Sequence, residues 1–374
     1  MNMTDFLCKS KRPTGQRVYR STSIFSLIVY LFLSAIPAIC RAGDESITIL
    51  AVGDMYLGGS AGAFLKQRGY SYPFEATKDI VANADIAVAN LEAPATNYEE
   101  VFTEKEYVIK TSPEAIEVIK AAGFDVVTLA NNHIMDYGAI GLKDTIELLD
   151  KAKIRYAGAG KDLKHARRPA IVNVKGKKIA FLAYSKVFPE EFYATNESSG
   201  TAPGFIEYVR GDIMDIKKLA DIIVVSFHWS EELLKYPKEY QVKLAHLAID
   251  NGASLVIGHH PHVIQGIERY KRGLIIYSLG NFIFGSYSKY GAEGMIAIAR
   301  FMNNRISSAE LIPLNVNNKE VLFQSRPLTD ERASAVIQDI QEISNGLQQD
   351  FMLLVKDGKG FISLNKGISS ASLP

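Results

Sequence analysis

The fold is decided by the stretch Ala253-Ser254-Leu255-Val256-Ile257-Gly258-His259-His260-Pro261-His262. Its first five residues form an apolar run that predicts a short buried strand. Three of the seven histidines of the chain follow within four positions, at the carboxyl end of that strand. Ligand-binding loops of α/β folds gather at such ends, and imidazole binds divalent metals and titrates near neutrality. The stretch therefore predicts an α/β protein with metal or acid–base chemistry, the alternative being an exposed turn rich in histidine.

The same pattern, an apolar run followed by a polar residue, recurs along the chain. Asp54 follows the run 47–52, Glu92 follows 84–89, Asn132 and His133 follow 124–129, and His228 follows 220–226. Amphipathic segments that predict helices alternate with these runs, at 113–122, 141–153, 240–251 and 330–345. This alternation predicts a mostly parallel sheet with helices outside it. Segments 294–300 and 306–314 alternate like antiparallel strands, which we expect to extend a second sheet.

Composition limits the classes of function. The 374 residues suffice for one large α/β domain or two smaller ones, and a formal net charge of +1 gives no argument for binding nucleic acid. Both cysteines, Cys8 and Cys40, lie in the first forty residues. The remainder of the chain therefore has no disulfide scaffold and no thiolate ligand, so a metal site must use histidine, asparagine and carboxylates.

Residues 1–43 are predicted to be an export signal or an uncleaved membrane anchor. Five basic residues between Lys9 and Arg20 precede the apolar run 24–39, and the small residues Ala42-Gly43 resemble a cleavage region. Because the basic residues come first, either alternative places residues 44–374 on the far side of the membrane, so the protein is expected to be extracytoplasmic. A lipoprotein anchored through Cys40 is disfavoured by the bulky Ile39 before it.

The polar residues at the strand ends suit a metal-dependent reaction. Oxygen and nitrogen ligands without sulfur favour Mn, Fe or Zn, and two such ions close together would clamp a phosphoryl or acyl oxygen. Glu92 would bridge them. His133 is placed to donate a proton to a leaving group, and Asp136, three residues on, would hold its ring in the required tautomer.

Structural alternatives exist for several of these residues. Asp54 suits a turn or a helix cap, Asn132 suits a turn, and His228 beside Trp229 suits a packed pair. Two further histidines, His165 and His246, are expected to be structural or solvated.

Seven motifs together resemble the bacterial poly-γ-glutamate capsule-biosynthesis (CapA-like) family, in order over about residues 47–290. They are Gly53-Asp54, Asn90-Leu91-Glu92-Ala93-Pro94, Ala130-Asn131-Asn132-His133-Ile134-Met135-Asp136-Tyr137-Gly138, Tyr156-Ala157-Gly158-Ala159-Gly160, His228-Trp229-Ser230-Glu231, Gly258-His259-His260-Pro261-His262 and Tyr277-Ser278-Leu279-Gly280-Asn281-Phe282. The resemblance implies a metallophosphatase-like fold of the calcineurin type, a four-layer α/β/β/α sandwich with mixed sheets. Residues 44–374 would form this domain, with C-terminal strands and a helix in 291–374.

The resemblance also implies roles for individual residues. The matching metal ligands are Asp54, Glu92, Asn132, His228, His260 and His262, with His259 as the alternative to His260. His133 matches the histidine of the Asn-His pair, and Asp136 keeps the orienting role that its spacing from His133 indicates. Tyr56 stands where that superfamily has a further histidine ligand, so the implied centre holds one or two divalent ions. Two further departures are Ser230, in place of glycine, and Ser254, in place of aspartate.

We therefore expect an exported protein for making or exporting the capsule polymer, with a metal-dependent hydrolase-like site that acts on a phosphoryl or acyl centre. One alternative is a non-catalytic accessory or polymer-binding subunit of a membrane capsule synthase. In that role Lys164, Arg167 and Arg168 would meet the anionic polymer or its precursor, although a solvated run of charge is a competing interpretation. The other alternative is a secreted phosphodiesterase unrelated to capsule.

Overall fold

The computed structural model describes residues 46–102, 105–287, 291–348 and 351–364. The predicted export segment 1–43, with both cysteines, lies outside these ranges. Within the described ranges, no helix is both long and apolar enough to cross a membrane.

The first of two central sheets contains ten strands, in the order β17-β18-β15-β14-β1-β2-β3-β4, with β13 paired to β1 and β16 to β15. These strands are β1 (Ile47–Tyr56), β2 (Ile86–Leu91), β3 (Val126–Thr128), β4 (Arg155–Ala157), β13 (Asn281–Phe284), β14 (Glu293–Met302), β15 (Arg305–Asn315), β16 (Arg326–Pro327), β17 (Leu354–Lys356) and β18 (Lys359–Ser363). From β1 to β4 the pairing is parallel, and from β1 through β14 to β15 it is antiparallel. All residues of β2 are buried, as expected of a parallel strand covered on both faces.

The second sheet contains six strands, in the order β11-β12-β10-β9-β7-β6. These are β6 (Ala170–Val174), β7 (Lys177–Ser185), β9 (Ile222–His228), β10 (Leu255–His259), β11 (Ile267–Tyr270) and β12 (Gly273–Ile276). Its four central strands run parallel and both edges are antiparallel, so this sheet is also mixed. A separate short pair joins β5 (Ala159–Gly160) to β8 (Gly200–Thr201).

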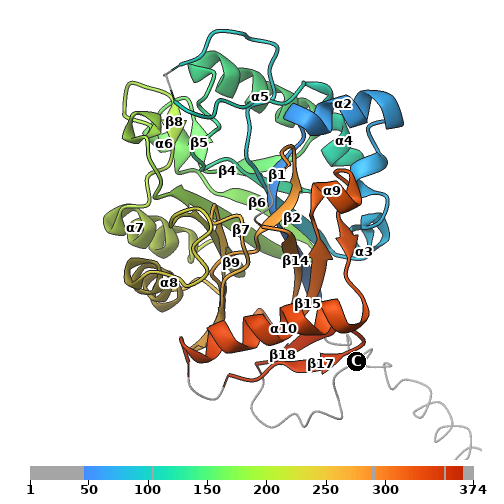
Figure 1. Ribbon diagram of the computed structural model, residues 1–374. Coiled ribbons are helices and arrows are strands. Elements are labelled where there is room, and N and C mark those ends of the chain that lie inside the picture. Colours follow the sequence, from blue (N-terminus) through green and yellow to red (C-terminus); the bar gives the residue numbers. More distant parts are fainter. Residues whose placement is uncertain (1–45, 103–104, 288–290, 349–350, 365–374) are drawn as a thin grey trace, which may run out of the picture. The chain divides into compact units, whose positions relative to one another are not determined.

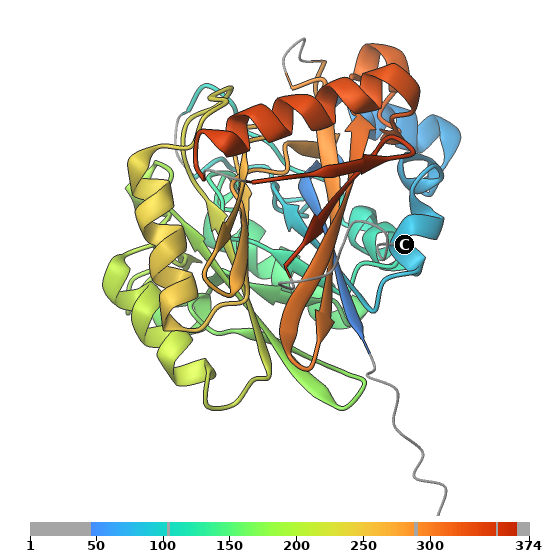
Figure 2. The ribbon, with the colours of Figure 1, turned by 90° about the horizontal axis from the view of Figure 1, so that it is seen from below.

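Helices cover the outer faces of both sheets (Figures 1 and 2). Those beside the first sheet include α4 (Glu114–Ala121) and α5 (Gly138–Ala152), and those beside the second are α7 (Ile206–Ile216) and α8 (Glu239–Asn251). The longest helix, α10 (Asp330–Asn345), packs against β11, β15 and β18. The others are α2 (Gly59–Arg68), α3 (Lys78–Ala82), α6 (Leu163–Ala166) and α9 (Asn318–Val321), with single 3₁₀ turns at Tyr72–Phe74 and Glu190–Phe192.

Three apolar cores hold these layers together. One lies between the two sheets, and its members include Ile49 of β1 and Val224 of β9. Another joins the first sheet to α4 and α5, where Leu142 and Leu149 are buried at helical spacing. The third joins the second sheet to α7 and α8. The prediction of a four-layer α/β/β/α sandwich with mixed sheets is therefore confirmed.

One expectation about the sheets is wrong. The antiparallel strands β14 and β15 extend the sheet of β1 instead of the second sheet, because β14 pairs with β1 from Ile47 opposite Phe301 to Ala51 opposite Ala297. Alternation of apolar residues indicates a strand with two unlike faces, but it carries no information about which neighbouring edge the strand joins.

Gly258 lets the histidine loop approach the core. It lies in β10 opposite Phe227 of β9, and a Cβ atom there would lie 1.8 Å from the carbonyl oxygen of Tyr277 and 2.7 Å from Trp229 Nε1. Trp229 is fully buried, stacks on Phe227 and donates a hydrogen bond to that same oxygen at 2.9 Å. Only glycine fits where these groups meet, which explains the residue that precedes His259.

Gly258→Ala is accordingly expected to lower the free energy of unfolding by about 3 kcal/mol, because the clash involves backbone on one side and a packed ring on the other. Gly211→Ala is the matched control, since no atom lies within 4 Å of its Cβ position in α7. That change should raise the free energy of unfolding by about 0.5–1 kcal/mol. Urea denaturation measures both, and equal small effects would contradict the tight approach at Gly258.

Candidate metal centre

The candidate site lies where the carboxyl ends of the two sheets meet. In the first sheet, Asp54 of β1 lies opposite Asn90 of β2, and in the second, His228 of β9 lies opposite His259 of β10. The backbone N–H of His260 donates to Asp54 Oδ2 at 3.1 Å. This bond ties the histidine loop of one sheet to a strand end of the other.

Glu92, His228 and His260 form one group that could hold a metal ion. All three are buried, and their potential ligand atoms lie within 4.8 Å of one another. The side chain of Asn132 joins them from the loop after β3, with its Oδ1 2.8 Å from His228 Nε2. The structure thus places four predicted ligands from distant parts of the sequence around one point.

Asp54, Glu92 and His262 form a second such group, again with ligand atoms within 4.8 Å of one another. Glu92 belongs to both groups, which is the position that a bridging carboxylate requires. Each group contains three protein ligands, and Tyr56 contributes to neither. Its ring is largely buried and stands edge-on to Phe284, with 5.4 Å between the two ring centroids.

His259 lies behind this centre. Its Nδ1 is 3.1 Å from Asp54 Oδ1, and its side chain belongs to neither group of three. Of the two alternatives that the sequence left open, the geometry favours His260 as the ligand.

Two buried atoms indicate that the residues present fit a divalent ion. Glu92 Oε1 has no hydrogen-bond partner among the described residues and lies 3.7 Å from both His228 Nε2 and His262 Nε2. His260 Nδ1 is likewise buried without a partner. A buried polar atom left unpaired costs about 1–3 kcal/mol, so an arrangement of this kind fits a cation that the unpaired oxygen and the imidazole nitrogens would share.

The two carboxylates differ in their proton affinity. Burial opposes the charge of Asp54, but hydrogen bonds from His259 and His262 outweigh it and hold the pKa of Asp54 well below its usual value. Burial, followed by the negative charge of Asp54, raises the pKa of Glu92 well above its usual value. Of the two carboxyl groups, Glu92 is therefore the one that holds a proton more tightly.

The histidines of the centre also differ in their pKa values. Burial lowers the pKa of His228 well below its usual value, and burial together with the charge of His262 lowers the pKa of His260 to about 3. Burial acts in the same direction on His262, but the charge of Glu92 and the hydrogen bond to Asp54 prevail and raise its pKa to about 10. His228 and His260 are thus neutral at pH 7, the form in which imidazole binds a metal.

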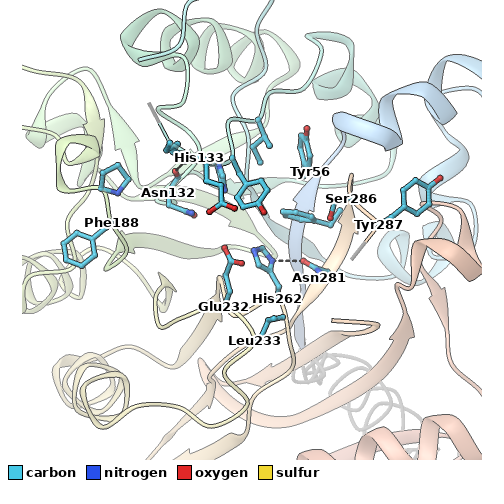
Figure 3. A pocket seen from close by; sticks show the side chains of 16 residues that line it. Tyr56, Asn132, His133, Phe188, Glu232, Leu233, His262, Asn281, Ser286 and Tyr287 are labelled. Atoms are coloured by element: carbon cyan, nitrogen blue, oxygen red, sulfur yellow. Dashed lines mark hydrogen bonds between the residues drawn. The ribbon is translucent and has the colours of Figure 1, made fainter. Parts of the chain in front are cut away.

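His133 lies beside the centre, on the wall of a pocket of about 800 Å³ (Figure 3), and the buried Asp136 lies next to its ring. His133 Nδ1 is 2.8 Å from Asp136 Oδ2, in agreement with the predicted pairing of ring and carboxylate. Burial first, and then the charge of Lys105, lower the pKa of His133, while Asp136 opposes them. Asn132, His262 and Asn281 line the same pocket, so the ring faces the same space as the candidate ligands.

Sequence reasoning missed Asn90 as a functional residue. Its Nδ2 donates to Asp54 Oδ1 at 2.9 Å and to Glu92 Oε2 at 3.1 Å, and it lies 3.4 Å from His228 Nδ1. Asn90 thus bridges the two carboxyl groups with its amide. The signal was present, because residues 90 and 92 are two apart and side chains two apart on a strand share a face.

Three further residues were missed. Asn131 donates to Asn90 Oδ1 and to the Leu91 carbonyl, and its own Oδ1 accepts the backbone N–H groups of His133 and Ile134. Asn281 Oδ1 lies 2.9 Å from His262 Nδ1. Lys105 contacts Asp136 and His133. Asn131 and Asn281 occur in two of the seven motifs, Asn131 beside the predicted ligand Asn132, and nothing local marked Lys105.

The four layers and the buried cluster of histidines and carboxylates define a metallophosphatase-like α/β protein. The chain belongs to the family described as "Bacterial capsule synthesis protein PGA_cap", which matches residues 48–286.

Curated relatives carry related names. The chain is 33% identical over 291 residues to the capsule biosynthesis protein CapA of Bacillus anthracis, covering 75% of this chain and 70% of the relative. It is 30% identical over 359 residues to the PGA biosynthesis protein CapA of Bacillus subtilis (strain 168), covering 94% and 92%. A probable polyglutamine synthesis accessory protein of Mycobacterium tuberculosis is 28% identical, covering 66% and 70%.

Solved structures that are similar to this chain include the calcineurin-like phosphoesterase YfkN of Bacillus subtilis, with 15% identity and a TM-score of 0.41 over 80% of this chain and 96% of that chain. The NAD nucleotidase of Haemophilus influenzae has 14% identity and a TM-score of 0.45 over 80% and 63%.

Proposed function

We propose that this protein is a metal-dependent hydrolase of the capsule-synthesis family, acting on a phosphoryl or acyl centre. The observation that carries the proposal is the position of Glu92, a buried carboxylate shared by two groups of three ligands, with an oxygen that no described residue satisfies. A purely structural cluster would pair that oxygen, because leaving it unpaired costs free energy.

The ligands would be divided between two ions. Glu92, His228, His260 and Asn132 would hold one, and Asp54, Glu92 and His262 the other. When bound, divalent Mn, Fe or Zn supplies a Lewis acid that polarises a phosphoryl or acyl oxygen and lowers the pKa of coordinated water.

The chain's own proton-transfer group would be His133. We assign the Nδ1 proton to the hydrogen bond with Asp136, because a carboxylate accepts hydrogen bonds at this short distance. That assignment leaves Nε2 as the ring atom available for proton transfer. Since the pKa of His133 is lowered, chiefly by burial, the resting ring is neutral; it would take up a proton at Nε2 from solvent in the pocket and deliver that proton to the leaving group as general acid.

The cellular role would follow from the family. Relatives are named for capsule and poly-γ-glutamate (PGA) biosynthesis, so we place this protein at the cell envelope, exported by residues 1–43, with the anionic capsule polymer or its precursor as partner. The alternative is a non-catalytic accessory subunit of a membrane capsule synthase, the kind of role that the name of the Mycobacterium relative describes.

Metal content and hydrolysis test the proposal directly. The full chain, stripped of metal, is given Mn²⁺, Fe²⁺ or Zn²⁺ and assayed with phosphate mono- and diesters and an acyl ester. We expect bound metal and hydrolysis, and we expect His260→Ala to lower both at least about tenfold. His165→Ala is the matched control, since that ring pairs with Asp162 away from the centre. A chain that binds no metal, or in which His260→Ala changes nothing, would contradict the hydrolase and support the accessory role.

A further inference from the structure

Lys105 joins two parts of the site that the sequence does not connect. It comes from the extended segment before α4, and its Nζ lies 2.6 Å from Asp136 Oδ1, 2.5 Å from the backbone carbonyl oxygen of Asn132 and 3.1 Å from His133 Nδ1. The same ammonium lies 5.2 Å from the centre of the Phe192 ring. A single cation therefore contacts three residues of one loop, which carries the candidate ligand Asn132 and the candidate acid His133.

This pair differs from an ordinary surface ion pair. The side chain of Lys105 is 19% exposed and that of Asp136 is not exposed, whereas exposed pairs contribute little to stability. Removing one partner of a buried pair leaves an uncompensated charge. Lys105 thus compensates the buried charge of Asp136, which is the group that orients the His133 ring.

Counting protons shows which of these contacts are hydrogen bonds. The ammonium only donates and an ionised carboxylate only accepts. His133 Nδ1 therefore cannot accept from Lys105 and donate to Asp136 at the same time. The 2.8 Å contact to Asp136 Oδ2 is the shorter, so Nδ1 donates there, and Oδ2 also accepts the Ile109 N–H at 2.8 Å. Lys105 is left with an ion pair to Asp136 Oδ1 and a hydrogen bond to the Asn132 carbonyl oxygen.

We propose that Lys105 is a positioning residue for proton transfer: by clamping Asp136 Oδ1 to the Asn132 carbonyl, it fixes the His133 ring so that Nε2 faces the reacting group. This inference rests on the proposed function and adds a residue that neither the motifs nor the ligand set includes. Because Lys105 acts through Asp136 and His133, its loss should impair proton delivery more than binding of substrate or metal.

Two phosphate monoesters separate this role from a structural one. Benzyl phosphate has a poor leaving group that needs a proton, and 4-nitrophenyl phosphate has a good one. For the metal-loaded full chain, we expect Lys105→Met to lower kcat about 100-fold on benzyl phosphate and less than about tenfold on 4-nitrophenyl phosphate, with little change in KM or metal content. Lys110→Met is the matched control, since Lys110 is similarly half-buried but pairs with Glu99 and the Tyr98 carbonyl.

The double variant Lys105→Met/Asp136→Asn removes both charges. It therefore leaves no uncompensated buried charge that could unfold the single variant. If Lys105 acts through Asp136, the double variant should lose no more activity on benzyl phosphate than Asp136→Asn alone. Equal losses on both esters for Lys105→Met, or additive losses in the double variant, would overturn the inference while leaving the hydrolase intact.

A measurement that does not depend on hydrolysis completes the test. In the metal-free chain, the Nδ1 proton of His133, assigned by its loss in His133→Ala, should give a downfield proton resonance that exchanges slowly with water. In Lys105→Met this resonance should broaden or vanish, and its persistence would contradict the positioning role. Absence of hydrolysis in the unmodified metal-loaded chain would instead contradict the proposed function, and with it the role of Lys105 in catalysis.

Discussion

Glu92→Gln is expected to abolish metal binding while leaving the metal-free fold intact. Burial and the charge of Asp54 raise the pKa of Glu92 well above its usual value, so burial favours its neutral form, which glutamine imitates. Glutamine can still accept the Asn90 hydrogen bond that Glu92 Oε2 accepts at 3.1 Å. It cannot, however, supply a charged bridging oxygen to either group of ligands. Bound metal should fall below about a tenth of the unmodified level, and hydrolysis by about 100-fold or more.

Thermal unfolding and elemental analysis distinguish these effects. Without metal, the variant should retain the stability of the unmodified chain to within about 1 kcal/mol, and only the stabilisation by added ion should disappear. Glu239→Gln is the control, because that side chain is 82% exposed on α8 and pairs with Lys243, away from the centre. A variant that still binds metal at full stoichiometry would show that Glu92 is not shared, and a large loss of stability without metal would show that its charge supports the fold.

The resemblance to the capsule-synthesis family implied the four layers and the ligand set, whereas the apolar runs by themselves predicted the parallel strands and the polar residues at their ends. Strands that are buried on both faces appear as nearly continuous apolar runs, and an ionisable side chain follows near the carboxyl end of each run, as at Asp54 and His228. The six predicted ligands converge because the carboxyl ends of both sheets face one another. A feature that depends only on strand direction is therefore readable from the sequence.

The features that could not be predicted from the sequence depend on contacts between segments that are distant in the chain. The spacing of Asn90 from Glu92 places the two on one face of a strand, but the position of Asn90 opposite Asp54 depends on the register of two parallel strands. Lys105 reaches Asp136 across thirty-one positions through an extended segment that has no periodicity. The placement of β14 beside β1 belongs to the same class, since pairing partners are chosen by the assembled sheet. Register and edge choice are collective properties, which explains why motif and periodicity could not supply them.

Asn90→Asp is expected to make the fold depend on metal. Asn90 Nδ2 donates to both Asp54 Oδ1 and Glu92 Oε2, so an aspartate would replace the donor by a third acceptor between two carboxyl groups. All three residues are at most 1% exposed, so solvent cannot screen the repulsion. We expect the metal-free protein to lose about 3 kcal/mol in free energy of unfolding, because a buried charge is left without a partner.

Divalent ion should reverse most of this loss, because two cations among three carboxylates would compensate the added charge. The rise in melting temperature on adding Zn²⁺ or Mn²⁺ should therefore be larger in Asn90→Asp than in the unmodified chain, as melts with metal and with chelator would measure. Asn345→Asp makes the same exchange on the exposed end of α10 and should leave the effect of metal unchanged. If chelator and metal leave the Asn90→Asp protein equally unstable, no ion binds between Asp54 and Glu92, and the cluster is a hydrogen-bonded core of the two sheets.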